Sequence, residues 1–295
     1  FECSFAGYCA QLAGTPPDYP VTLLPGNGGK PLARRLLDEG FEDLRDVPGE
    51  RMPPGRLALI HRVTVSGEPH LDADKAREML AALPYPRFFF DFETISFSVP
   101  IWAGTSPYEK LPFQWSCHIE REPGQFEHRE FLDLSGENPI RACAESLLQA
   151  LETQGAIVAY HDSFERGVIK ALAERYPDLH DALMAVHARF FDLEKAVRDC
   201  YYHPAMMGSW SIKKVLPTVA PDLDYAKLEE VQDGGGAQEA YVNAIDPNVT
   251  PERKAELRQR LLTYCGLDTW AMVVLAWFLE GRGRPVPGTQ PHLSG

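Results

Sequence analysis

The chain has 295 residues, of which 44% are hydrophobic and 24% are charged, and its formal net charge is −13. This composition is that of an ordinary globular protein, and the negative charge argues against a broad basic surface for nucleic acid. No apolar run approaches the roughly 20 residues that cross a bilayer, and no signal peptide is visible. We therefore expect a cytoplasmic protein without a membrane partner. Residue 1 is Phe rather than Met, so we also expect a fragment of a longer chain.

The six cysteines form two groups. Four of them are widely spaced in apolar segments and are expected to be small buried core residues in a reducing compartment: Cys117, Cys143, Cys200 and Cys265. Cys3 and Cys9 differ, because they lie close together in the stretch "FECSFAGYC" at the start of the chain.

Turn-forming residues divide the chain into three zones. Residues 1–84 are loop-rich, with "GTPPDYP", "LPGNGGKP" and "RMPPG" as breakers, and residues 31–52 predict two short helices around Gly40. Residues 85–280 alternate strand and helix signals. Residues 281–295 are rich in Gly and Pro and are expected to form a disordered tail.

The middle zone predicts an α/β sheet with helices packed on it. Its pattern favours a strand meander over 88–94, 112–120 and 124–134, followed by a helix over 138–155, a strand over 156–161 and a helix over 163–177. A brief strand running into a helix is expected over 188–202, a short helix over 209–217, and a last helix from the N-cap Thr250 to about Gly281. The long aromatic link over 95–111 is typical of a functional loop.

Two carboxylates stand in the first predicted strand. Asp91 and Glu93 have the same parity, so their side chains point to one face. Flanked by phenylalanines, they would repel each other in a low-dielectric setting, and a divalent cation such as Mg²⁺ or Mn²⁺ would remove that repulsion. The alternative is an edge strand whose acids face water.

Two more acids follow at the ends of other elements. Asp268 lies in a nearly continuous apolar run and shares a helical face with Tyr264, four residues earlier. Its alternative is an acid that faces solvent or caps a helix. Glu165 is expected in the first turns of a helix, where the macrodipole favours an acid, and that stabilisation could be its whole role. Asp162 is a rival for the role of Glu165, but its position just after the strand favours a cap on the same helix.

Three segments together resemble a known superfamily. Asp91-Phe92-Glu93-Thr94, the run from Tyr160 to Glu165 and Tyr264-x-x-x-Asp268 resemble the three motifs of the DnaQ-like 3′–5′ exonucleases, with the spacing of their tyrosine (DEDDy) subtype. The resemblance implies a ribonuclease H-like mixed sheet flanked by helices, carrying a small loop-rich and helical N-terminal segment. Glu165 stands where that superfamily usually has Asp, and His161 where Asn is commoner.

A narrower resemblance covers most of the chain. The segments "PFQWS", "GSWSIKKVLP" and "VQDGGGA", together with the three motifs, resemble a bacterial family described as a domain of unknown function. That family is typically attached C-terminal to a RecB-like nuclease module with an iron–sulfur cluster. The resemblance implies that such a module lies upstream in the full-length protein, and that Cys3 and Cys9 match two of the four cluster ligands.

The implied activity is metal-dependent 3′–5′ exonucleolytic hydrolysis of phosphodiester bonds in DNA or RNA. Asp91, Glu93, Glu165 and Asp268 would hold two Mg²⁺ or Mn²⁺ ions in a two-metal mechanism, with Asp91 as the bridging ligand. Tyr264 would orient the attacking water. The alternative is a non-catalytic nucleic-acid-binding or scaffold domain that accompanies a RecB-like nuclease.

Substrate contacts are expected from the motifs and from one helix. Thr94, His161 and Phe164 are assigned to substrate binding, and Phe164 is also expected to pack in the core and position Glu165. Lys213 and Lys214 would contact phosphate, or else form a solvated helix face.

Other segments have two readings each. Trp102, Tyr108 and Trp115 are candidates for stacking on a terminal base, with core packing the default for Trp115. Residues 233–237 form either a backbone nest for an anion or a flexible loop. Residues 36–49 resemble a helix-hairpin-helix, or form a packing hairpin.

Overall fold

The structure is a computed structural model that describes residues 5, 7, 8, 15–223, 225, 228 and 231–286. It divides into two compact units: the first comprises residues up to Leu71 together with Tyr201–Thr218, and the second comprises Asp72–Cys200 together with the chain from Val219. The expected boundary at residue 84 therefore differs from the division in the structure. Helix α4 (Ala73–Ala81) packs on helices of the second unit, whereas strand β7 (Tyr201–Tyr202) returns to pair with β1 (His70–Leu71) of the first.

The first unit is small and mostly helical. Besides β1, β7 and the short helix α9 (Ile212–Val219), it contains α2 (Gly26–Asp38), η1 (Val21–Leu23), η2 (Leu44–Asp46), η3 (Gly49–Arg51), α3 (Arg56–Ser66) and η4 (Pro204–Met206). Of the two helices expected around Gly40, the first is α2. The second is replaced by the single turns η2 and η3, because Pro48 between them lacks the backbone donor that a continuous helix needs. The pair of helices of a helix-hairpin-helix is therefore not formed there.

The second unit is built on a five-stranded mixed sheet. Its strands are β2 (Arg87–Ile95), β3 (Leu111–Glu122), β4 (Gln125–Leu132), β5 (Ala156–Ala159) and β6 (Phe190–Asp192), in the order β4-β3-β2-β5-β6. The β2–β3 and β3–β4 pairs are antiparallel, and the β2–β5 and β5–β6 pairs are parallel. The predicted ribonuclease H-like class, a meander followed by alternating strands and helices, is confirmed.

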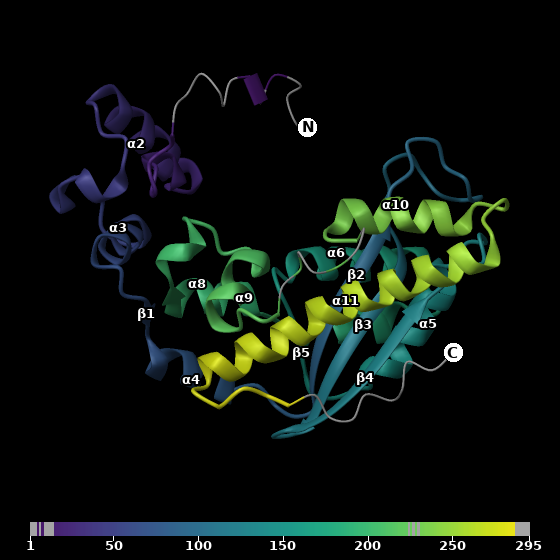
Figure 1. Ribbon diagram of the computed structural model, residues 1–295. Helices are drawn as coiled ribbons and strands as arrows, with labels where there is room; N and C mark the ends of the chain where they lie inside the picture. Colours follow the sequence, from purple (N-terminus) through teal and green to yellow (C-terminus); the bar gives the residue numbers. More distant parts are fainter. Residues whose placement is uncertain are drawn as a thin grey trace. The chain divides into compact units, whose positions relative to one another are not determined.

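Helices cover both faces of this sheet. They are α4, α5 (Ile140–Leu151), α6 (Ser163–Arg175), α7 (His180–His187), α8 (Leu193–Cys200), α10 (Gly234–Ile245) and α11 (Pro251–Leu279). The long helix α11 runs across β2, β3 and β4 (Figure 1). On β3, Ser116 shares a hydrogen bond with Thr269 of α11, while the neighbouring Trp115 donates to Ser146 of α5. Since successive residues of a strand point to opposite faces, α11 and α5 lie on opposite sides of the sheet.

Strand β2 occupies the middle of the sheet because its residues suit burial on both faces. Phe88, Phe90 and Phe92 share one face, where the Phe90 and Phe92 rings meet edge to face at 4.7 Å. Gly155 directly precedes β5, which pairs with β2. Only glycine fits at this position, because its φ is +91° and a Cβ would lie 2.1 Å from the Pro86 carbonyl oxygen. The other face of β2 carries the two acids.

Helix α11 corrects one expectation from the sequence. It begins at the predicted N-cap, where Thr250 accepts a hydrogen bond from the Arg253 amide. By length and composition alone it could cross a membrane, although the sequence was expected to lack such a run. However, 67% of its most apolar window is buried within the protein, as in a core helix.

Two other segments also differ from expectation. Residues 233–237 are neither a nest nor a loop: the Asp233 side chain accepts from the Gly236 amide at 2.8 Å and caps the start of α10. Residues 281–286 are held by ion pairs rather than disordered, with Arg282 bound to Glu120 and Arg284 to Asp222. The rest of the expected tail lies outside the described residues.

Candidate metal centre

Three carboxylates meet where α11 crosses the central strand. One side-chain oxygen from each of Asp91, Glu93 and Asp268 can be chosen so that all three lie within 4.8 Å of one another. Asp91 and Glu93 come from the middle strand of the sheet, so the edge-strand alternative is wrong. Asp268 is only 9% exposed and lies inside a continuous helix, so it is neither a solvent-facing acid nor a cap. The structure therefore brings together three of the four acids that were expected at the site.

Local structure aims the acids at one point. The shared parity of Asp91 and Glu93 directs both toward α11, and the β2–β3 register shifts directly after Glu93. Such bulges re-aim side chains and are frequent near functional sites. On the helix side, the Cys265 sulfur lies 3.9 Å from Asp91 Oδ2, and Thr269 Oγ1 lies 2.8 Å from His118 Nδ1. These contacts set the rotation of α11 that presents Asp268 to the strand.

The three acids are electrostatically costly as they stand. The pKa of Asp91 is raised well above its usual range, first by burial and then by the negative charges of Asp268, Glu165 and Glu93. A site made only of carboxylate oxygens suits hard divalent cations such as Mg²⁺ and Mn²⁺. The donor set therefore fits the expected cation.

Glu165 lies close enough to act on Asp91 but is not a member of the group of three. It lies in the first turn of α6 and is 3% exposed. Burial raises its pKa to about 8, and the charges of Asp162 and Asp192 add to the shift. Its Oε2 atom is buried without a hydrogen-bond partner among the described residues. Buried polar atoms normally have a partner, and a cation would provide one.

Two tyrosines border Asp268. Burial, followed by the charge of Asp268, raises the pKa of Tyr264, so its phenol stays protonated at neutral pH. Tyr225 donates a hydrogen bond to Asp268 Oδ1 at 2.6 Å, and its ring centroid lies 6.4 Å from that of Tyr264. Sequence reasoning missed Tyr225, because a single aromatic residue between α9 and α10 carries no spacing signal.

The second motif is organised differently from expectation. His161 is exposed, has a φ of +69°, and its Nδ1 lies 2.8 Å from Glu194 Oε2. Asp162 occupies the N-cap position of α6 but makes no capping bond with its side chain, which instead accepts from Arg166 at 2.6 Å. Phe164 is only partly buried, because its ring faces the Lys110 ammonium at 4.6 Å instead of the core.

The remaining predicted contact residues separate into several groups. Thr94 is buried in β2 beside the acids. Trp102 and Trp115 are buried and bonded to Gly136 and Ser146, so they are not available for stacking. Lys213 and Lys214 lie in the first turn of α9 and belong to the first unit, whereas the acids belong to the second. Cys3 and Cys9 lie outside the described residues.

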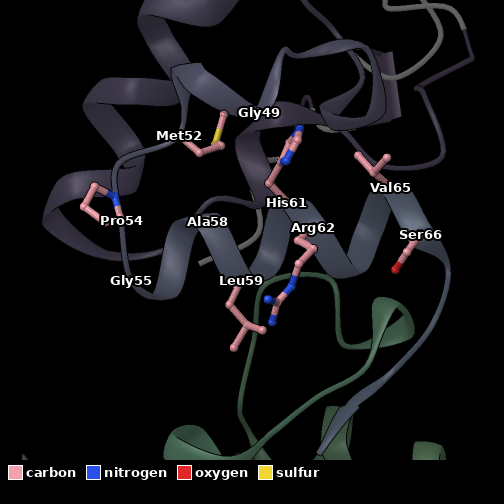
Figure 2. Close-up of a pocket in the computed structure, with 10 residues that line it drawn as sticks. All are labelled: Gly49, Met52, Pro54, Gly55, Ala58, Leu59, His61, Arg62, Val65 and Ser66. Carbon is pink, nitrogen blue, oxygen red and sulfur yellow. The ribbon is translucent and has the colours of Figure 1, made fainter.

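The first unit has a pocket of its own. It has a volume of about 700 Å³, and its lining from η3 and α3 is mostly apolar (Figure 2). The one histidine of the lining, His61, already donates from Nε2 to the Val47 carbonyl at 2.7 Å. The pocket therefore offers shape and apolar surface but no cluster of reactive groups.

Comparisons with known proteins give a match to a family model over part of the chain, but no activity. Residues 88–211 match the family model described as "Domain of unknown function (DUF2779)", in agreement with the expected kind of family. Similar proteins include the "Uncharacterized protein MG366 homolog" of Mycoplasma pneumoniae, 25% identical over 70% of this chain and 34% of that protein. The "Uncharacterized protein MG366" of Mycoplasma genitalium is 23% identical over 66% and 32%. The chain thus spans about a third of these relatives, and no solved structure matches it significantly.

Proposed function

We propose that the second unit is a metal-dependent 3′–5′ exonuclease that hydrolyses phosphodiester bonds of DNA or RNA. The observation that carries the proposal is the group of carboxylate oxygens from Asp91, Glu93 and Asp268, mutually within 4.8 Å. The order and spacing of the three motifs, which resemble those of the DnaQ-like superfamily, supply the reaction class. Membership of that superfamily is part of the proposal.

Each residue has a role that follows from its surroundings. Asp91, Glu93 and Asp268 would hold Mg²⁺ or Mn²⁺, and Glu165 would add its unpartnered Oε2. Bound divalent ions would lower the pKa of a coordinated water and stabilise the charge that develops during displacement at phosphorus. Tyr264, kept protonated by burial, would hold the attacking water through its hydroxyl and would not act as a base.

One assay tests the activity directly. The protein is incubated with 3′-labelled and 5′-labelled single-stranded DNA and RNA in Mn²⁺, beside Asp91→Ala and the control Asp181→Asn, whose side chain is fully exposed. We expect stepwise shortening from the 3′ end, lost in Asp91→Ala and kept in the control. Equal degradation by Asp91→Ala would contradict the proposal.

The second candidate function is a non-catalytic domain that binds nucleic acid or acts as a scaffold. One observation favours it: Glu165 replaces the usual Asp and is not a member of the group of three acids. A domain that binds metal and nucleic acid without turnover, beside a RecB-like nuclease with an iron–sulfur cluster, would show metal binding but no shortening. Either function suits a reducing cytoplasm, where the four buried cysteines stay free: Cys117, Cys143, Cys200 and Cys265.

A further inference from the structure

The loop between β2 and β3 leaves the end of the strand that carries the acids, and it is firmly held. Trp102 donates to the Gly136 carbonyl at 2.9 Å and meets Phe97 edge to face at 5.5 Å. Arg175 donates to the Gly104 carbonyl at 2.8 Å and forms an ion pair with Glu109. A long loop with these anchors is an ordered part of the surface.

This ordered loop nevertheless exposes apolar side chains. Val99, Ile101 and Tyr108 are each more than half exposed, and Tyr108 is 74% exposed. Tyr108 also has a φ of +59°, a conformation that is unfavourable for a bulky side chain. Because most of its side chain is exposed, the Tyr108 ring contributes little to packing, whereas the Trp102 ring in the same loop is buried.

Lys110 connects the loop to the acidic site. It is exposed, and its ammonium lies 4.6 Å from the centroid of Phe164, the residue that precedes Glu165. Its positive charge acts on Glu165, against the burial and the neighbouring acids that raise the pKa of that group. A cation beside a cluster of acids is the group that an approaching phosphate would meet.

Resting on the proposed function, we propose that Tyr108 and Lys110 form the subsite for the nucleotide next to the cleaved bond. An unpaired base would stack on the Tyr108 ring, since any base offers a face to an aromatic side chain, and its phosphate would pair with the Lys110 ammonium. Val99 and Ile101 would cover the edge of the base. The subsite would bind single strands, because a base inside a duplex is stacked on both faces and offers no free face to the ring.

Binding measurements separate this subsite from the catalytic proposal. The probes are 5′-fluorescein oligodeoxythymidylate and oligouridylate, followed by anisotropy in Ca²⁺, with a blunt DNA duplex for comparison. We expect Tyr108→Ala to weaken single-strand binding by at least about fivefold and Tyr108→Phe to restore it. Lys110→Ala should lower the slope of log K against log salt by about 0.7, the value for one phosphate contact. Lys170→Ala, an exposed lysine on α6, should change neither quantity. Thermal melting of each variant checks that the fold is intact.

Every outcome decides one of the two proposals. Wild-type affinity and salt slope in both Tyr108→Ala and Lys110→Ala would overturn the subsite, even if Asp91-dependent shortening is seen. Binding that follows the expected pattern without shortening in Mn²⁺ would overturn the exonuclease and leave Tyr108 and Lys110 as a binding site for single strands. An absence of binding by the wild-type protein would overturn the subsite.

Discussion

Tyr225 donates its phenolic hydrogen to Asp268 Oδ1 at 2.6 Å, although 43 residues separate the two in sequence. In the absence of a cation, this bond stabilises a carboxylate that is otherwise surrounded by like charges. The hydroxyl therefore acts on the same group that would ligate the metal.

Tyr225→Phe should destabilise the metal-free protein more than the metal-loaded protein. Hydrogen bonds to charged groups contribute about 1.5–3 kcal/mol, and a bound cation would replace most of that contribution. Urea unfolding in EDTA and in Mg²⁺ measures both values. Tyr241→Phe is the matched control, because the Tyr241 hydroxyl is buried without a hydrogen-bond partner among the described residues. An equal loss for Tyr225→Phe in both buffers would contradict the prediction.

Divalent metal should raise the melting temperature. A ligand at 100 times its Kd stabilises the folded state by about 2.7 kcal/mol, which is several degrees for a chain of this size. Asp91→Asn should melt higher than the wild type in EDTA, because it removes a repelling charge, and should lose most of the metal response. Calorimetry with Mg²⁺ and Mn²⁺ checks both effects, and Asp181→Asn should respond as the wild type does.

The metal-free protein should become less stable as pH rises. Because burial raises the pKa of Glu165 from 4.5 to about 8, the folded state holds a proton that the unfolded chain releases in this interval. The free energy of unfolding then falls between pH 4.5 and 8, by up to about 1.4 kcal/mol per pH unit for one proton. Denaturant midpoints in EDTA measure the slope, which Glu165→Gln should reduce. A rise in stability across this interval would refute the assignment.

Glu165 can be tested by changing its charge and its length separately. Glu165→Gln keeps the size of the side chain but removes its charge. If Glu165 Oε2 ligates the metal, this variant should lower the exonuclease rate by about 100-fold or more. Glu165→Asp keeps the charge but shortens the reach by one methylene, so it should retain metal-dependent activity at a lower rate. Single-turnover kinetics at saturating Mn²⁺ distinguish the variants. Unchanged activity in Glu165→Gln would place this residue outside the metal centre.

One prediction depends only on the fold. Glu120 is fully buried and accepts from Arg282 at 3.0 Å and from the Trp277 indole at 3.1 Å, while the Arg282 guanidinium carbon lies 3.6 Å from the centroid of the same ring. Arg282→Ala removes the cation that faces this acid and should cost about 1–3 kcal/mol. Arg284→Ala breaks only an exposed pair with Asp222 and should cost less than about 1 kcal/mol. Similar losses of stability in both variants would show that the burial of Glu120 does not strengthen its ion pair with Arg282.

The parts of the site on regular elements were predictable from the sequence. The parity of Asp91 and Glu93 and the helical spacing of Tyr264 and Asp268 follow from local geometry. The acids therefore meet once the sheet is assembled with β2 at its centre and α11 across it. Tyr225 could not be found, because its partner is set by tertiary packing and its segment has no periodicity.

The same limit explains the errors in the fold. Helix α10 was missed because Gly234, Gly235 and Gly236 at its start have poor helix propensity, which the Asp233 cap and packing on α11 overcome. The structure divides the chain differently from the expected boundary at residue 84, because residues 201–218 belong to the first unit and begin with a two-residue pairing to β1. No local pattern announces such a return of the chain.

The position of Asp268 on the last helix of the described chain has a consequence during synthesis. A growing chain exposes Asp91, Glu93 and Glu165 to the cell long before the ribosome has made Asp268. Because proteins fold progressively as they emerge, the sheet can start to form before all three carboxylates of the candidate metal centre are present. A chain whose translation stops before α11 therefore carries Asp91, Glu93 and Glu165 but lacks the three-carboxylate site.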